Sequence, residues 1–234
     1  MNLYKTIHFK EIDSTNKYLK EHHQELENFT FVSTDYQNKG KGRNDRFWTA
    51  TRGENLLFSL LLKDEKYIKL GGLLSLIASI SVSKILEEKY HFKDVQIKWP
   101  NDVYVDDKKI CGILLEGQYP SYIVIGVGLN VNQIEFKGDY RKTPTSIALE
   151  LGKKIDISVL KEPLYVALLE NITTEKDYID YFNKHNFLLN KMVEVRIDNK
   201  DIVGKVVGVD NEYNLLIESD NKIVKIISGE IKVI

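Results

Sequence analysis

Cysteine is nearly absent from this sequence, with Cys111 the single one in 234 residues. One thiol cannot form a disulfide within the chain, so a small fold held together by disulfides is excluded. Residues 1–14 also lack the apolar core that a secretion signal needs. From these two absences we expect a cytoplasmic protein.

Long hydrophobic runs and an excess of one charge are missing as well. The longest apolar segment, residues 70–86, contains Lys84, two glycines and four serines, and it is shorter than the ~20 apolar residues that span a bilayer. The 33 Lys and Arg residues nearly cancel the 34 Asp and Glu residues, so no field over the whole chain attracts DNA or an acidic membrane. We therefore expect neither partner, and any phosphate recognition must be local.

The composition that is present, 43% hydrophobic and 29% charged residues, is typical of a folded protein. Patterns of secondary structure then divide the chain into two parts. Strands are predicted at residues 4–12, 29–36, 55–62, 95–98, 103–105, 110–116 and 122–127. Helices are predicted at residues 17–22, 67–90, 143–151 and 158–185. Residues 192–234 show only the β pattern, with turns at 198–199, 210–211, 220–221 and 228–229.

Consecutive short strands favour antiparallel pairing. We therefore predict an α+β fold, in which residues 1–187 form a mixed, mostly antiparallel central sheet with helices packed on it. Residues 188–234 are predicted to form a small C-terminal β-barrel.

A basic, glycine-rich segment interrupts the pattern at residues 40–46, Gly-Lys-Gly-Arg-Asn-Asp-Arg. Glycine lets backbone N–H groups approach an anion closely, and Lys and Arg neutralise it, so phosphate or carboxylate is the natural target. The segment has neither the ending of a P-loop nor the spacing of a dinucleotide fingerprint. Trp48 follows it and could stack on a base. A basic surface loop beside a core tryptophan explains the same residues, and the loop alone leaves both interpretations open.

Three further clusters lie at the ends of predicted strands. Residues 98–102, Lys-Trp-Pro-Asn-Asp, place two polar side chains after a proline; Asp102 either caps the turn or holds Mg²⁺ or a ribose. Lys109 enters an apolar strand, where an ammonium group faces either solvent or a developing negative charge. Residues 126–132, Gly-Val-Gly-Leu-Asn-Val-Asn, contain strand glycines of the kind that allow close approach by a ligand or another backbone.

Together and in this order, these clusters resemble the biotin-protein ligase family. The family's loop Gly-Arg-Gly-Arg-x-Gly-Arg-x-Trp is similar to residues 40–48, and its Lys-Trp-Pro-Asn-Asp stretch is unaltered at 98–102. Its Lys-x-x-Gly-Ile-Leu-x-Glu and Gly-x-Gly-x-Asn stretches correspond to residues 109–116 and 126–130. The resemblance covers about residues 13–132, with a looser match near the C-terminus.

Smaller features agree with the family or depart from it. Ser-Thr-Asn at residues 14–16 and Tyr-Gln at 36–37 agree. Lys41 stands where the family usually has Arg, which keeps the charge but loses the bidentate geometry. Asp45 replaces a usual Gly, which adds a negative charge and restricts the backbone of the loop.

The resemblance implies a fold and an activity. The catalytic domain would be class II synthetase-like, with biotin and ATP bound in residues 1–187, and the C-terminal barrel would be SH3-like. The enzyme would form biotinyl-5′-AMP with Mg²⁺ present and pass biotin to a lysine of a biotin carboxyl carrier protein, the acceptor domain of a biotin-dependent carboxylase. Because the matching residues begin at Asp13, we expect the monofunctional form without an N-terminal DNA-binding domain or a repressor function; a homodimer is left open.

The resemblance also implies roles for individual residues. Catalysis would depend on Lys109, Arg43 and Asp102. Biotin would be bound by Ser14, Thr15, Asn16, Gln37, Gly40, Lys41, Arg43, Lys109 and Gly112. ATP and the adenylate would be bound by Arg43, Arg46, Trp48, Asn101, Asp102, Lys109 and Asn130. No protein ligands to a metal are expected, and no catalytic role is assigned to Cys111, His8, His22, His23, His91 or His185.

Two other functions stay under consideration. A lipoate-type ligase uses a similar catalytic domain and the same adenylation chemistry, although the basic glycine loop and Lys-Trp-Pro-Asn-Asp favour biotin. A nucleic-acid-binding module would use residues 39–46 to hold phosphates and the C-terminal barrel to read single strands. The net charge of −1 argues against that second function.

Overall fold

The central sheet provides the framework of the protein in the computed structural model, which describes residues 4–44, 46–138, 140, 142–174, 177–197 and 200–234. Its strands are β1 (Lys5–Phe9), β2 (Thr30–Thr34), β3 (Asn55–Leu62), β4 (Val95–Lys98), β5 (Asp102–Val105), β6 (Lys108–Gln118) and β7 (Tyr122–Asn130). The spatial order is β1-β2-β3-β7-β6-β5-β4. β1 and β2 run parallel and the other neighbours antiparallel, so the predicted mixed, mostly antiparallel sheet is confirmed.

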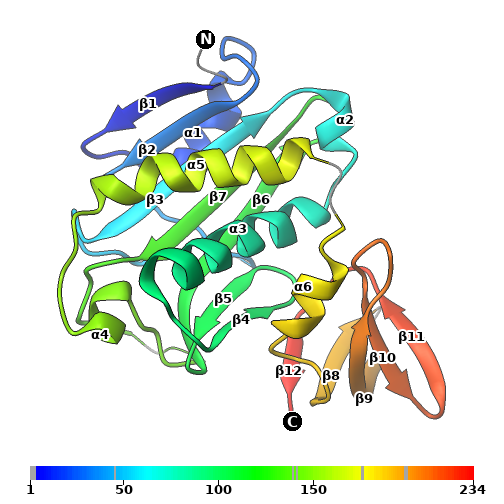
Figure 1. The fold of residues 1–234 in the computed structure, drawn as a ribbon. Helices are drawn as coiled ribbons and strands as arrows, with labels where there is room; N and C mark the ends of the chain where they lie inside the picture. The colour runs from blue at the N-terminus through cyan, green and yellow to red at the C-terminus, as the bar shows by residue number, and fades with distance from the viewer. Residues whose placement is uncertain (1–3, 45, 139, 141, 175–176, 198–199) are drawn as a thin grey trace.

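Helices cover both faces of this sheet (Figure 1). They are α1 (Thr15–His22), α2 (Glu65–Ile68), α3 (Leu73–Tyr90), α4 (Ile147–Leu151), α5 (Ser158–Thr173) and α6 (Ile179–Lys184). α3 and α5 lie side by side on one face, and α1 packs on the other. Because the sheet is covered on both faces, all eight residues of β3 are buried. Among the described residues, no helix is both long and apolar enough to span a bilayer.

Three of the predicted helices are shorter than their patterns suggested. The helix expected at 67–90 is divided into α2 and α3, because Gly71 adopts a left-handed conformation with φ of 53° between them. The helix expected at 158–185 is divided into α5 and α6, and the one expected at 143–151 begins only at Ile147. Apolar periodicity continues across these breaks because both sides pack on the same core, so it does not locate helix ends.

The C-terminal unit is a five-stranded antiparallel sheet in the described part of the chain. Its strands are β8 (Met192–Ile197), β9 (Lys200–Val209), β10 (Leu215–Ser219), β11 (Lys222–Ile226) and β12 (Ile231–Val233), in the order β11-β10-β9-β8-β12. Asp220 and Asn221 have positive φ at the predicted β10–β11 turn. The turn predicted at 198–199 lies outside the described residues. Apolar side chains of this sheet belong to the same hydrophobic cluster as the core under α3 and α5.

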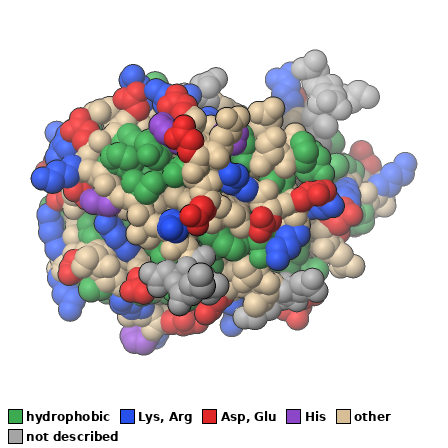
Figure 2. Space-filling model, turned by 90° about the horizontal axis from the view of Figure 1, so that it is seen from above, with side chains coloured by type: hydrophobic (Ala, Val, Ile, Leu, Met, Phe, Trp, Pro, Cys, Tyr) green, Lys and Arg blue, Asp and Glu red, His purple; other side chains and the backbone are tan. Residues whose placement is uncertain are grey.

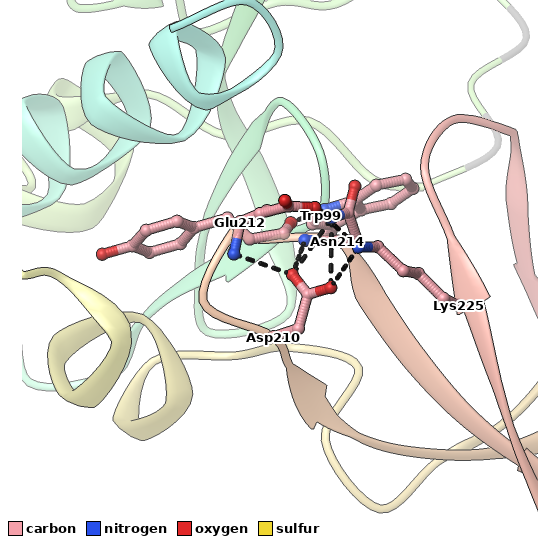
Figure 3. Close-up of polar contacts among 6 residues, drawn as sticks. Trp99, Asp210, Glu212, Asn214 and Lys225 are labelled. Carbon is pink, nitrogen blue, oxygen red and sulfur yellow. Dashed lines mark hydrogen bonds and ion pairs between the residues drawn. The ribbon is translucent and has the colours of Figure 1, made fainter.

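A polar cluster in the β9–β10 turn connects the two sheets (Figure 3). The carboxylate of Asp210 accepts hydrogen bonds from the backbone of Glu212 and Asn214 and pairs with Lys225 at 2.8 Å. The turn formed in this way presents the carbonyl of Tyr213, which accepts a 3.0 Å hydrogen bond from the buried indole of Trp99. Trp99 belongs to the Lys-Trp-Pro-Asn-Asp stretch between β4 and β5. The cluster therefore anchors that stretch to the C-terminal sheet.

Replacing Asp210 with Asn is expected to lower the melting temperature at pH 7 by a few degrees. Burial acts to raise the pKa of Asp210, but Lys225 and the hydrogen bonds from Asn214 and Glu212 outweigh it and lower the pKa to about 2. The stability that the carboxylate contributes is therefore present above pH 3.8 and lost as the pH falls toward 2. Thermal unfolding should show that the difference in melting temperature between wild type and Asp210→Asn becomes smaller as the pH falls from 3.8 toward 2.

The exposed Asp201, which faces Arg196 at 3.6 Å, offers a control for this experiment. Asp201→Asn should leave the melting temperature nearly unchanged both at pH 7 and as the pH falls toward 2, because exposed ion pairs contribute little to stability. An Asp210→Asn protein as stable as the wild type at pH 7 would contradict the anchoring role.

Candidate active site

A cavity of about 850 Å³ opens between the central sheet, the basic loop and the C-terminal sheet. It is lined by Ser14, Thr15, Asn16, Gln37, Lys41, Arg43, Arg46, Trp48, Asn101, Asp102, Lys109, Gly112 and Asn130 among the residues predicted for the site. These residues come from the N-cap and first residues of α1, the chain after β2, the residue before β5, and β5, β6 and β7. Residues spread over the chain from Ser14 to Asn130 therefore meet at one cavity.

Gly40 is the predicted site residue that the structure does not bring to the cavity wall. Its carbonyl accepts a 2.9 Å hydrogen bond from the backbone of Trp48, and a Cβ atom on it would lie 2.6 Å from the Trp48 carbonyl. Gly40 thus closes the base of the loop, where two backbone segments approach each other too closely for a side chain. This position explains the glycine without a contact to a ligand.

The basic loop folds back on itself. The N–H of Gly42 donates to the carbonyl of Arg46 at 2.7 Å, and Lys41 bridges to Phe47 in antiparallel fashion. Lys41 lines the cavity at the position where the family usually has Arg. The other departure, Asp45, lies outside the described residues.

Both arginines of the loop reach the segment before β12. Arg43 donates to the side chain of Asn101 at 3.2 Å and to the carbonyl of Gly229 at 3.1 Å. Arg46 pairs with Glu230 at 2.5 Å. Burial lowers the pKa of Arg43, Asp102 opposes this, and Arg46 adds to it. The segment before β12 therefore holds the loop over the cavity. Sequence analysis missed Gly229 and Glu230 because no local motif distinguishes them.

Lys109 and Asp102 form an ion pair of 2.8 Å in the cavity wall. Lys109 also lies 5.5 Å from the centre of the Trp48 ring. A β-bulge shifts the register between β5 and β6, so that Val103 faces Cys111 but Tyr104 faces Lys109. The ammonium group is thereby held in the cavity by a carboxylate, where phosphate or carboxylate oxygens of a ligand can compete for it.

The indole of Trp48 rests on a surface made of glycine. Gly112 and Gly128 are cross-strand partners in β6 and β7. Cβ atoms added to them would lie 2.8 Å and 2.5 Å from ring carbons of Trp48. Side chains at these two positions would exclude the ring, which explains why both strands carry glycine here.

Asn130, at the end of β7, presents a buried acceptor at the cavity. Its Nδ2 donates to the carbonyl of Thr145 at 2.9 Å, which orients the amide. Its Oδ1 has no hydrogen-bond partner among the described residues, although the side chain is only 3% exposed. Buried polar atoms are normally paired, so this oxygen is suited to accept an N–H group from a ligand.

The opposite end of the cavity is polar and tightly hydrogen-bonded. Thr15, which follows the N-cap residue Ser14, donates its N–H to Oε1 of Gln37 at 2.8 Å. Its hydroxyl lies 2.6 Å from the hydroxyl of Ser59, which donates to Oδ1 of Asn16 at 2.6 Å. Ser59 was missed by sequence analysis, although a single serine in the apolar strand β3 is a signal that a buried partner exists.

Cys111 and the five histidines are not among the residues that line the cavity. Burial raises the pKa of the Cys111 thiol, which disfavours the reactive thiolate. Across the described ranges, no group of three or more His, Cys, Asp or Glu residues could hold a metal ion.

Comparison with known proteins adds independent findings. The family model described as "Biotin/lipoate A/B protein ligase family" matches residues 8–130, and the model "Biotin protein ligase C terminal domain" matches residues 188–233. The structure is similar to the biotin protein ligase from Aquifex aeolicus in complex with biotin and ATP, with a TM-score of 0.87, 31% identity and 98% of each chain covered.

Curated relatives are similar in sequence. The bifunctional ligase/repressor BirA of Bacillus subtilis is 31% identical over 221 residues, covering 87% of this chain and 66% of the relative. The biotin--[acetyl-CoA-carboxylase] ligase of Mycobacterium tuberculosis is 26% identical, covering 84% of this chain and 76% of the relative. This chain thus spans about two thirds of the first relative's length and nearly all of the Aquifex aeolicus chain.

Proposed function

The chain belongs to the biotin/lipoate A/B protein ligase family, and from this premise we propose that it is a biotin-protein ligase. It joins biotin to ATP as biotinyl-5′-AMP and then transfers biotin to a lysine of a carrier protein. The observation that carries the proposal is that a polar end, the Lys109–Asp102 pair and the Trp48 surface lie together in one cavity. A volume of about 850 Å³ suits a vitamin and a nucleotide bound side by side.

The first half-reaction converts an unreactive carboxylate into a mixed anhydride. A biotin carboxylate oxygen attacks the α-phosphorus of ATP, and pyrophosphate leaves. Lys109 and Arg43 offset negative charge that gathers on the carboxylate and the α-phosphate. Asp102 holds the Lys109 ammonium at the cavity wall until phosphate oxygens compete for it.

Mg²⁺ belongs to the proposal because it neutralises phosphate charge when it is bound with ATP. Among the described residues, the acidic side chains that line the cavity are Asp102, which pairs with Lys109, and Glu230, which pairs with Arg46. With so few acidic side chains, the ion would take its oxygen ligands chiefly from the phosphates, and Asp102 would be the carboxylate that helps to hold it.

The second half-reaction needs no nucleophile from the enzyme. The carrier lysine amine attacks the carbonyl carbon of the adenylate, an amide forms, and AMP leaves. The basic loop, held by Gly229 and Glu230, covers the intermediate and excludes water. The name of the Mycobacterium tuberculosis relative supports a carboxylase carrier domain as the acceptor.

The ends of the cavity suggest how the adenylate lies. The biotin ring occupies the polar end, at Ser14, Thr15, Asn16 and Gln37. The adenosine contacts Trp48, and Oδ1 of Asn130 accepts an N–H from it. The acyl phosphate lies between these ends, beside Lys109.

A lipoate-type ligase is the nearest alternative, since the family model covers both activities. The polar end favours biotin, because a dithiolane ring carries no hydrogen-bonding groups to satisfy it. Incubating the protein with ATP and either acid, followed by identification of the adenylate by mass, separates the two.

A nucleic-acid-binding function finds less support. Arg43 and Arg46 of the basic loop contact Asn101, Gly229 and Glu230 at the cavity. On the face shown in Figure 2, basic and acidic side chains are interspersed and do not gather by sign. Neither arrangement provides the continuous basic surface that binds a polyanion.

Biotin-dependent exchange of labelled pyrophosphate into ATP tests the proposal directly. The assay follows the first half-reaction and needs no carrier protein. Exchange that requires biotin is the expected result, and exchange with lipoate alone, or none with either acid, would contradict the proposal.

Replacing Arg43 with Gly is expected to speed release of the adenylate by about ten- to a hundredfold, the equivalent of losing charge-assisted hydrogen bonds. Both guanidinium contacts that join the loop to Asn101 and Gly229 would be lost. Release is measured as free biotinyl-5′-AMP in solution after a single turnover. Arg52→Gly, which removes an arginine that pairs with Glu11 outside the cavity, is the matched control. Unchanged release from Arg43→Gly would contradict the retaining role.

A further inference from the structure

Glu116, in β6, is connected to the polar end of the cavity although it does not line it. Its carboxylate accepts a 2.9 Å hydrogen bond from Nδ2 of Asn16 and forms an ion pair with Lys20 of α1. A carboxylate can only accept hydrogen bonds. The atom of the Asn16 amide that faces Glu116 must therefore be the donor nitrogen, Nδ2.

This contact settles the orientation of the Asn16 amide. Nδ2 faces Oε2 of Glu116 and, at 3.4 Å, the carbonyl of Leu114, so both neighbours are acceptors. Turning the amide over would place oxygen against oxygen twice. Oδ1 must then point to the hydroxyl of Ser59, which donates to it at 2.6 Å. Asn16 is 4% exposed and Ser59 is fully buried, so water does not relax this requirement.

The direction of the hydrogen bonds continues to Thr15. Because the Ser59 proton is given to Asn16, the 2.6 Å contact between the hydroxyls of Ser59 and Thr15 requires Thr15 to donate. The other protein oxygen near the Thr15 hydroxyl is Oε1 of Gln37 at 3.1 Å, which is also an acceptor. The one proton of the Thr15 hydroxyl therefore has acceptors within the protein, and toward a ligand in the cavity this hydroxyl is left to act as an acceptor.

Gln37 receives a complementary orientation. Its Oε1 accepts the backbone N–H of Thr15 at 2.8 Å. Turning the amide over would place its Nε2 donor against this N–H donor, so the orientation of the amide is fixed. Its Nε2 remains as the donor group. The cavity end therefore offers an acceptor at Thr15 beside a donor at Gln37, and a cyclic urea carries the matching pair, an N–H next to a carbonyl.

We infer that Glu116 is a positioning residue that fixes the direction and the placement of the hydrogen-bond network behind the Thr15 hydroxyl, with which the cavity recognises the urea group of biotin. It acts through Asn16, Ser59 and Thr15 and touches neither substrate. The inference rests on the proposed function, because it assigns the cyclic urea of biotin to this end of the cavity. A glutamine at position 116 can donate as well as accept, so it removes the constraint on Asn16, and the direction of the network becomes free to reverse.

Calorimetric titration of biotin into the full-length protein tests the inference with three variants, Glu116→Gln, Ser59→Ala and the double variant. Each single variant is expected to raise the Kd for biotin about tenfold, the equivalent of one hydrogen bond. The double variant should be no weaker than Ser59→Ala alone, because the network is already interrupted at Ser59. The Kd for ATP should stay unchanged in all three.

Lys20→Met provides the control, because it removes the ion pair but keeps the carboxylate that orients Asn16. It should bind biotin like the wild type. A Glu116→Gln protein with wild-type biotin affinity, or effects of Glu116→Gln and Ser59→Ala that multiply in the double variant, would overturn the inference. Should Glu116→Gln not fold, an unchanged biotin Kd in Ser59→Ala overturns it equally.

The wild-type measurement separates this inference from the proposed function. If the wild type neither binds biotin nor forms its adenylate, the proposed function is wrong. If it does both and the variants bind biotin equally well, only the role of Glu116 is wrong.

Discussion

Lys109→Ala is expected to slow formation of biotinyl-5′-AMP by about a hundred- to a thousandfold, the usual cost of removing one group that stabilises transition-state charge. The variant removes the cation beside the reacting groups and also leaves the Asp102 carboxylate facing the phosphates. The lost ion pair is partly exposed, with side-chain exposures of 30% for Lys109 and 19% for Asp102. Its contribution to stability should therefore be only about 1 kcal/mol or less.

Single-turnover formation of the adenylate, measured beside thermal unfolding, checks this prediction. Lys108→Ala is the matched control, because Lys108 is the neighbouring lysine but pairs with Glu150 at 2.8 Å and does not line the cavity. It should adenylate biotin at nearly the wild-type rate. If Lys109→Ala lost folding and activity in parallel, Lys109 would have a structural role instead.

Gly128→Ala is expected to raise the KM for ATP by roughly ten- to a hundredfold, which is what the loss of a stacked base costs. The new methyl group would lie 2.5 Å from Cε2 and 2.8 Å from Nε1 of Trp48, so the indole must leave the glycine surface. The polar end of the cavity does not involve Gly128, and the KM for biotin should change much less.

Steady-state kinetics with each substrate varied in turn gives both constants. Gly72→Ala is a suitable control, because a Cβ at Gly72 has no heavy atom within 4 Å and the residue lies before α3, outside the cavity. A folded Gly128→Ala protein with an unchanged KM for ATP would show that Trp48 does not need this surface to bind the nucleotide.

Some of the site follows from local sequence alone. Gly126, Gly128 and Asn130 alternate along β7, and because side chains in a strand alternate between faces, all three lie on one face. The turn after β4 follows from the proline in Lys-Trp-Pro-Asn-Asp. These signals depend on neighbours in the chain, and both segments that they mark contribute residues to the cavity wall.

Other parts could not be predicted in this way. Lys109 and Gly112 are three positions apart, so a regular strand would direct them to opposite faces. The β-bulge between β5 and β6 brings both into the cavity, and a bulge depends on the partner strand. Gly229 and Glu230 reach the basic loop only because the C-terminal sheet packs beside it, about 185 positions further along the chain.

The amino-acid sequence by itself determined the α+β class, the strands and their order along the chain, and the residue types available for acyl-adenylate chemistry. It could do so because alternation, turn residues and glycine positions are local properties. Only the tertiary structure decided that Glu116 contacts Asn16 in a network crossing α1, β3 and β6, and that the segment before β12 contacts Arg43 and Arg46. Hydrogen-bond direction and ion pairing depend on which atoms meet in space, and no spacing along the chain records that.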